Sequence, residues 1–258
     1  MNLRELIKRY NNIKPYTTAT QLCNIKELVA LIGNKPIIKI NDVVISKLIR
    51  AYQAKGNSNK TINDKLSILR GLLKYAYSIG EIQYIPLIPT QKVTDTRTKT
   101  LSRKELALML SYCHQTKEKQ LAYILLIGYY TGFRINNILS LTPDNYSIED
   151  NILSIYDKKV NRFHTIPVSK KIQYIMNKIA FNLSYRQCYY LFTIMKQKLN
   201  LDETITIHTL RHTFCSNLVN KDVPISTIQR LANHKNINTT MRYTHTKDEQ
   251  LIKAIDVL

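Results

Sequence analysis

Apolar residues recur at helical spacing through the first 85 residues of the chain. Leu3, Leu6, Ile7 and Tyr10 fall three or four positions apart and predict a first helix. Further helices are predicted near residues 20–31, after residue 41 and over residues 60–79. Each of these is bounded by a residue type that commonly starts or ends a helix: Gly33, Asn41 and Gly80. Residues 1–85 are therefore expected to form a helical domain.

Residues 86–100 interrupt this pattern with two prolines, five threonines and few apolar positions. Such a composition is typical of an inter-domain linker. A new helix is predicted after Ser102, because Ser102 and Glu105 have the spacing of a capping box. Residues 120–130 are apolar enough to form a central core helix. The expected division is thus a first domain over 1–85, a linker over 86–100 and a second domain over 101–258.

The second domain changes pattern once. Residues 151–168 alternate between apolar and polar positions around a basic turn, which predicts an antiparallel hairpin or a three-stranded sheet. Helical spacing then resumes and predicts helices over 170–179, 185–199, 210–220 and 226–231, a short helix near 239–243 and an amphipathic tail. The fold class expected is mainly α with a small antiparallel sheet (α+β).

Charge narrows the range of partners. The 258 residues carry a formal net charge of +20, and 44% of them are hydrophobic, enough to build a core. Residues 1–93 have fifteen Lys or Arg against five Asp or Glu, so about half of the excess lies in each part of the chain. An excess of this size indicates a polyanion such as double-stranded DNA, although a solvated lysine-rich surface has the same composition.

Cysteine usage and hydropathy indicate the cellular compartment expected for the protein. The four cysteines are scattered without a C-x-x-C pair, which is typical of thiols in a reducing compartment. The N-terminus does not have the pattern of a signal peptide. The longest apolar run, residues 121–131, is too short to span a bilayer. The expectation is a cytoplasmic protein without a membrane partner.

The last fifth of the chain, residues 207–246, concentrates groups that suit a phosphodiester. His208 and Arg211 lie three positions apart at the start of a predicted helix, where they share one face near the positive end of the helix dipole. His234 follows, and Tyr243 comes nine residues later. Taken singly, each has a structural alternative: a capping histidine, a surface arginine, a turn histidine and a packing tyrosine.

Other chemistries are less well supported. His208, His212 and Cys215 fall at i, i+4 and i+7, which could present metal ligands, but no second ligand cluster is placed to complete a site. The chain also lacks a G-x-x-x-x-G-K phosphate loop. Neither a metal nor a nucleotide cofactor is therefore expected.

Five segments from residue 131 onward resemble the motifs of tyrosine recombinases, the phage-integrase and Xer-type enzymes. They are TGFRINNILSL, the basic turn DKKVNR, HTLRH, LANH and NTTMRYTH, in the order of the family. Residues 61–76 more loosely resemble the last helices of the family's SAM-like core-binding domain. The resemblance implies two domains that clamp DNA. It also implies a catalytic set, which here is Arg134, Lys159, His208, Arg211, His234 and Tyr243.

The same resemblance implies a mechanism. The Tyr243 hydroxyl attacks the scissile phosphorus and forms a 3′-phosphotyrosyl bond, while Arg134 and Arg211 stabilise the non-bridging oxygens. Lys159 is the expected general acid, with Lys158 beside it as the alternative. His208 assists as a base or by positioning Tyr243. His234 is expected to donate to the phosphate, and neither metal nor ATP is needed.

Two positions depart from the family pattern. Asn137 stands where an acidic residue is usual, three positions after the first arginine, and such a carboxylate would orient Arg134. Asn233 stands where glycine is usual before the histidine, and asparagine tolerates the left-handed conformation better than most residues. Both changes leave the reacting groups in place but put full activity in question.

The expected function is site-specific recombination of DNA, by integration, excision or resolution. Two alternatives share part of the evidence: a type IB topoisomerase-like nicking-closing enzyme, and a DNA-binding regulator with weakened catalysis. The apolar face of the tail, with Ile252, Ile255 and Leu258, predicts docking on a neighbouring protomer in a homo-tetramer on paired sites. Accessory DNA-bending proteins are further candidate partners.

Overall fold

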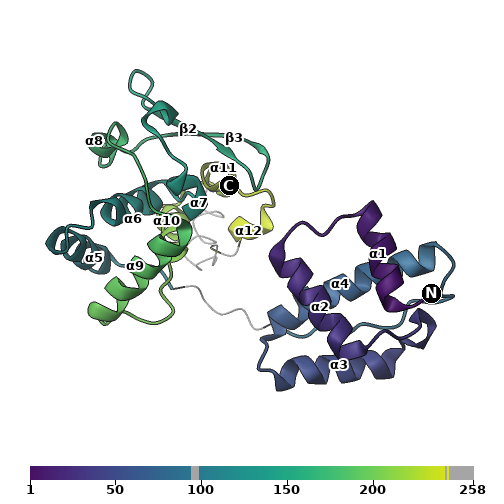
Figure 1. Ribbon diagram of the computed structural model, residues 1–258. Coiled ribbons are helices and arrows are strands. Elements are labelled where there is room, and N and C mark those ends of the chain that lie inside the picture. The colour runs from purple at the N-terminus through teal and green to yellow at the C-terminus, as the bar shows by residue number, and fades with distance from the viewer. Residues whose placement is uncertain (94–98, 242, 244–258) are drawn as a thin grey trace, which may run out of the picture. The chain divides into compact units, whose positions relative to one another are not determined.

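A computed structural model describes residues 1–93, 99–241 and 243 of the chain. The chain divides into two compact units, Met1–Thr96 and Arg97–Leu258, and each has a hydrophobic core of its own. Helices dominate both units, and the second also contains a small antiparallel sheet (Figure 1). The mainly helical class with a small sheet, expected from the sequence, is confirmed.

The first unit is built from helices that begin and end at the expected residues. These are α1 (Leu3–Ile13), α2 (Ala19–Ile32), α3 (Asp42–Ala54) and α4 (Asn59–Ser78), with the 3-10 helix η1 (Ile37–Lys39) between α2 and α3. The Asn41 side chain accepts a hydrogen bond from the Val44 amide at 3.2 Å, which satisfies a free donor at the start of α3. Gly33 ends α2 with a φ of +78°, which glycine adopts without strain.

The segment expected to begin the linker is attached to the first unit. The Asn63 side chain on α4 bonds both the amide and the carbonyl of Gln91, each at 2.8 Å. The Arg70 guanidinium donates to the Ile88 carbonyl at 3.1 Å, and Ile88 itself is buried. Residues 88–91 therefore lie along α4 because two polar side chains of that helix satisfy their peptide groups.

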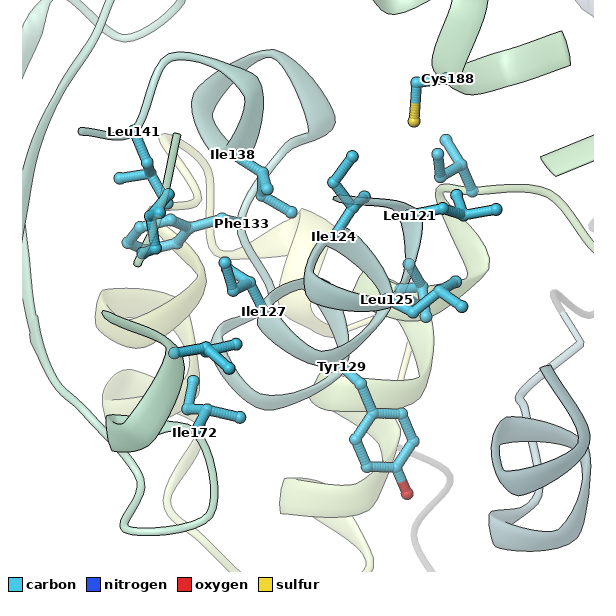
Figure 2. Packing of buried hydrophobic residues seen from close by; sticks show 14 of the residues in the cluster. Leu121, Ile124, Leu125, Ile127, Tyr129, Phe133, Ile138, Leu141, Ile172 and Cys188 are labelled. Carbon is cyan, nitrogen blue, oxygen red and sulfur yellow. The ribbon is translucent and has the colours of Figure 1, made fainter. Parts of the chain in front are cut away.

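The second unit is organised around α6 (Lys119–Thr131), which packs against α5 (Arg103–Gln115), α9 (Tyr185–Lys198) and α10 (Thr209–Val219). Apolar residues lie all around α6, as expected of a central helix. Figure 2 shows several of these side chains pointing into the surrounding core: Leu121, Ile124, Leu125, Ile127 and Tyr129. Gly128 lets α10 approach closely, since a Cβ there would lie 2.9 Å from the Leu210 side chain.

The sheet follows α6 and the short helices α7 (Ile135–Leu139) and η2 (Pro143–Asn145). Strand β2 (Ile152–Asp157) lies between β1 (Tyr146–Ser147) and β3 (Arg162–Pro167), and both pairings are antiparallel. Ile152 faces Pro167 at one end, and Asp157 faces Arg162 at the other. A four-residue loop joins β2 to β3, and Asn161 closes it with a positive φ of 58°.

The remaining elements are α8 (Gln173–Met176), α11 (Ile225–Ala232) and α12 (Asn238–Met241). The helix expected over 170–179 is reduced to α8, because the segment winds in successive three-residue turns. Amide-to-carbonyl bonds join Ile172 to Ser169, Ile175 to Ile172 and Lys178 to Ile175. Within the described ranges, none of the helices is long and apolar enough to cross a membrane. The tail residues expected to dock on a neighbour, 252, 255 and 258, lie outside those ranges.

Candidate active site

Arg211 lies on the first turn of α10 and is buried, with only 4% of its surface exposed. Its guanidinium donates to the Gly132 carbonyl at 2.7 Å and to the Ala232 carbonyl. Burial and the nearby charge of Arg134 lower its pKa to about 10, so it is still a cation at neutral pH. Arg211 therefore connects the ends of α6 and α11 to α10 while it keeps its positive charge.

Arg134 follows a sharp turn after α6. Gly132 ends that helix in the left-handed conformation, with a φ of 65°, and a Cβ at this position would overlap the Phe214 ring of α10. The turn places Arg134 at the start of α7, where its guanidinium donates to the Asp157 carboxylate at 2.7 Å and, more weakly, to the Asn233 carbonyl at 3.4 Å. The expectation that Gly132 permits a turn into Arg134 is confirmed.

Asp157 was not singled out from the sequence. It ends β2 on the core-facing side of the strand and is 1% exposed. Burial raises the pKa of its carboxyl, but a hydrogen bond from Asn137, the charge of Arg134 and hydrogen bonds from Lys159 and Asn233 together lower that pKa below its ordinary value. The carboxylate is thus ionised at neutral pH beside the arginines.

Lys158 and Lys159 follow Asp157 directly in the loop between β2 and β3, and both are exposed. The Lys159 amide donates to the Asp157 carboxylate at 3.0 Å. This hydrogen bond from the amide of residue i+2 to the aspartate side chain forms an Asx turn at the start of the loop. The charge of Lys159 also contributes to lowering the pKa of His208, so its ammonium group lies within electrostatic range of the site.

Tyr243 comes just after α12, and its amide bonds the Thr240 carbonyl. Its hydroxyl lies 2.6 Å from Nδ1 of His212, and Tyr243 also lowers the pKa of the buried Cys215 thiol, although burial raises that pKa overall. The Tyr243 ring is parallel to the His234 ring, with centroids 6.4 Å apart. The histidine that contacts the tyrosine hydroxyl is thus His212, which the sequence had suggested only as a metal ligand.

His234 and His208 complete the cluster. His234 is 4% exposed and its Nδ1 shares a hydrogen bond with the Thr240 hydroxyl at 2.9 Å. Burial and the positive charges of Arg211 and Arg134 lower the pKa of His234 to about 3. The His208 residue keeps a solvent-exposed surface, yet burial of its ring and its cationic neighbours lower its pKa to about 4. Both imidazoles are therefore neutral at pH 7 in the free protein.

Asn233 ends α11 in the left-handed conformation, with φ 51° and ψ 49°, as expected for a residue at a glycine position. Its side chain does more than tolerate the turn. The amide nitrogen donates to Asp157 at 3.1 Å, and the amide oxygen accepts two hydrogen bonds from Arg162, at 2.6 and 2.9 Å. Asn233 therefore joins the end of α11 to both strands of the hairpin.

The six site residues expected from the sequence, Arg134, Lys159, His208, Arg211, His234 and Tyr243, all lie in the second unit. The charges of the arginines and of Lys159 affect the pKa values of the histidines, and the rings of His234 and Tyr243 lie parallel. Not expected from the sequence were the parts that Asp157, His212 and Arg162 take in the site, or the side-chain contacts of Asn233. One sequence signal could have found Asp157, since it continues the buried face of β2 after Leu153 and Ile155. A carboxylate on the apolar face of a strand needs charged or polar partners.

The depressed pKa of His234 makes the stability of this unit depend on pH. Between pH 6.5 and about 3 the unfolded chain binds a proton at this residue that the folded chain does not. We expect the free energy of unfolding to fall as the pH drops below 6.5, by about 2 kcal/mol at pH 5 from this residue. Urea denaturation at pH 7 and pH 5 measures the loss.

The His234→Asn variant is the control, because it lacks the titrating ring but keeps a polar side chain next to Thr240. Its stability is expected to fall by about 2 kcal/mol less than that of the wild type over the same pH interval. An equal loss in both proteins would contradict the assignment of a buried neutral ring.

Comparisons with known proteins identify the family of the chain. Residues 99–182 and 175–250 match the model of the phage integrase family. The tyrosine recombinase XerC of Thermodesulfovibrio yellowstonii is 26% identical over 84% of this chain and 82% of its own length. The XerA recombinase of Saccharolobus solfataricus is 26% identical over 90% of this chain and 81% of its own length.

Solved structures give the same fold. The Tn1549 transposon integrase in complex with transposon right end DNA superposes with a TM-score of 0.86, at 17% identity over 100% of this chain and 99% of that one. A lambda integrase tetramer bound to a Holliday junction gives 0.79, at 17% identity over 95% and 78%. Because the family model covers more than half of the residues, the chain belongs to the phage integrase family and is a tyrosine-type site-specific recombinase.

Proposed function

We propose that the chain cleaves and rejoins double-stranded DNA through a covalent 3′-phosphotyrosyl intermediate on Tyr243. The observation that carries this proposal is the convergence of Arg134, Arg211 and His234 on the part of the second unit that holds the Tyr243 hydroxyl. The charge of Arg134 helps to lower the pKa of Arg211, so the two guanidinium groups repel, and an anion bound by both relieves the repulsion. A phosphodiester is such an anion, and its transition state carries more charge on the same oxygens.

In the proposed step, the Tyr243 oxygen bonds the scissile phosphorus and the bond to the 5′ oxygen breaks. The hydroxyl proton passes to His212, whose Nδ1 lies 2.6 Å away, and His208 stands edge-on to His212 with ring centroids 4.8 Å apart. Arg134 and Arg211 bind the non-bridging oxygens. His234, with Nδ1 engaged by Thr240, offers Nε2 to the phosphate. Lys159 gives its proton to the leaving 5′ oxygen, and the reverse step with another strand's 5′ hydroxyl completes the exchange.

Several observations support DNA as the partner. Both parts of the chain are strongly basic, and the Tn1549 and lambda integrases that share the fold are described in complexes with DNA. In this proposal the two units grip one duplex, with residues 1–85 as the core-binding domain, 86–100 as the linker and 101–258 as the catalytic domain. A covalent step that conserves the phosphodiester bond energy requires no ATP.

The nucleophile is tested by Tyr243→Phe, with Tyr185→Phe as the matched control on an exposed tyrosine of α9. The substrate is a nicked suicide duplex that traps the covalent adduct. We expect the Tyr243→Phe variant to bind the duplex in a gel-shift assay but to form no adduct, because the attacking oxygen is gone. The control is expected to form the adduct like the wild type, and an adduct in the Tyr243→Phe variant would refute the proposal.

The general acid is tested with a substrate that does not need one. A sulfur atom in place of the leaving 5′ oxygen leaves without protonation, because a thiolate is a much better leaving group than an alkoxide. Lys159→Ala is expected to slow cleavage of the ordinary duplex by about a hundredfold or more and to cleave the sulfur-substituted duplex at nearly the wild-type rate. Lys158→Ala serves as the neighbouring control and is expected to cleave both substrates normally. The reverse pattern would assign the proton to Lys158.

We further propose that the active assembly is a homo-tetramer on two DNA sites, consistent with the lambda integrase tetramer on a Holliday junction. The sequence places Ile252, Ile255 and Leu258 on one face of the tail, suited to a groove of the next protomer. Deleting residues 248–258 is expected to leave binding to one site unchanged and to impair pairing of two sites, as followed by native gel electrophoresis. Normal recombination by the shortened chain would rule out this role for the tail.

A further inference from the structure

The two positions at which the chain departs from its family converge on one carboxylate. The Asn137 side chain, which replaces the usual acidic residue, helps to lower the pKa of the Asp157 carboxyl. Asn233, which replaces the usual glycine, donates to the same carboxylate at 3.1 Å. The two asparagines lie 96 positions apart in the sequence, so their common partner is a property of the folded unit.

The Asp157 carboxylate also contacts the two catalytic segments that precede α10. One oxygen accepts the Arg134 guanidinium at 2.7 Å, and the other accepts the Lys159 amide at 3.0 Å. The carboxylate is 1% exposed, whereas the Arg134 side chain is 20% exposed. The charge is therefore fixed inside the unit, and the guanidinium that it holds still reaches the surface.

The side chains around Asp157 differ in whether they carry a charge. The Asn233 amide donates a hydrogen bond to the carboxylate, and the Asn137 amide helps to lower its pKa, but neither amide carries a charge of its own. Asp157 supplies a negative charge, which makes its hydrogen bond to Arg134 charge-assisted and stronger than one to an amide oxygen. In the family pattern, an acidic residue at position 137 would supply such a charge to Arg134.

We propose that Asp157 is the positioning residue that replaces the acidic residue absent at position 137, and that it orients Arg134 toward the phosphate while anchoring the turn that carries Lys159. The inference rests on the proposed function, since it assigns Arg134 and Lys159 their parts in cleavage. Asn137 and Asn233 then hold the replacement carboxylate in place. One carboxylate thus sets both the phosphate-binding arginine and the lysine that protonates the leaving group.

The test exchanges the carboxylate at position 157 and the amide at position 137. Single-turnover cleavage of the suicide duplex is measured at saturating protein for the wild type, Asp157→Asn, Asn137→Asp and the double variant. Asp144→Asn, an exposed aspartate near the same sheet, is the control for loss of one negative charge. Gel-shift titration and thermal unfolding of each variant separate cleavage from binding and folding.

We expect Asp157→Asn to slow cleavage by about ten- to a hundredfold, the range for removing a hydrogen bond to a charged group. The double variant is expected to recover at least about tenfold of that loss, because the carboxylate returns beside Arg134 from position 137. Asp144→Asn is expected to cleave like the wild type. A merely structural role for Asp157 predicts no such recovery.

A second substrate reports on Arg134 itself. A methylphosphonate at the scissile position replaces one charged oxygen with a neutral methyl group and so depends less on the arginines. If Asp157 acts through Arg134, the rate loss of Asp157→Asn on this substrate is expected to be several-fold smaller than on the ordinary duplex. An equal loss on both substrates would overturn the part of the proposal that routes through Arg134.

The outcomes distinguish this inference from the function on which it rests. If the wild type forms no adduct on Tyr243, the proposed function fails. If the wild type forms the adduct but Asp157→Asn cleaves at the control rate, or the double variant is as slow as Asp157→Asn, the function stands and the positioning role of Asp157 is refuted.

Discussion

Burial of the Arg211 guanidinium is the constraint on which the arrangement of the second unit depends. A cation removed from water must have its hydrogen bonds satisfied inside the protein. Arg211 satisfies them with the carbonyls of Gly132 and Ala232, which are the C-terminal ends of two helices, where carbonyl groups are otherwise unpaired. The residues that follow those carbonyls are Phe133–Arg134 and Asn233–His234, so one buried arginine fixes the start of two segments that carry candidate site residues.

The second constraint is the repulsion among cations. The charges of Arg134 and Arg211 make any further positive charge nearby less favourable. Two features of the site reflect this. His208 and His234 lose their protons, since burial and the arginines depress both pKa values. Asp157 keeps its negative charge and pairs with Arg134. The free protein therefore presents two guanidinium groups and neutral imidazoles, so that the arginines supply the positive charge that a bound phosphate would meet.

This balance also explains why the departures at 137 and 233 are compatible with an intact site. An asparagine at 137 carries no charge, but Asp157 at the end of β2 pairs its carboxylate with Arg134. An asparagine at 233 keeps the left-handed turn and adds hydrogen bonds to Asp157 and Arg162 that glycine could not make. The hairpin is thereby tied to the end of α11, and the loop that carries Lys159 does not depend on its own short strands alone.

The sequence by itself determined most of the helices, the small sheet, the turn at Gly132 and the candidate site residues, because each depends on local spacing or on a short motif. Helix caps at Asn41 and Ser102 and the alternation in β2 are local signals of this kind. Only the tertiary structure decided which groups orient the reactive ones. Asp157 meets Arg134 across 23 positions and Asn233 across 76, and His212 meets the Tyr243 hydroxyl across 31. Such pairings follow from how α6, α10, α11 and the hairpin pack around a buried charge, and no periodicity along the chain encodes them.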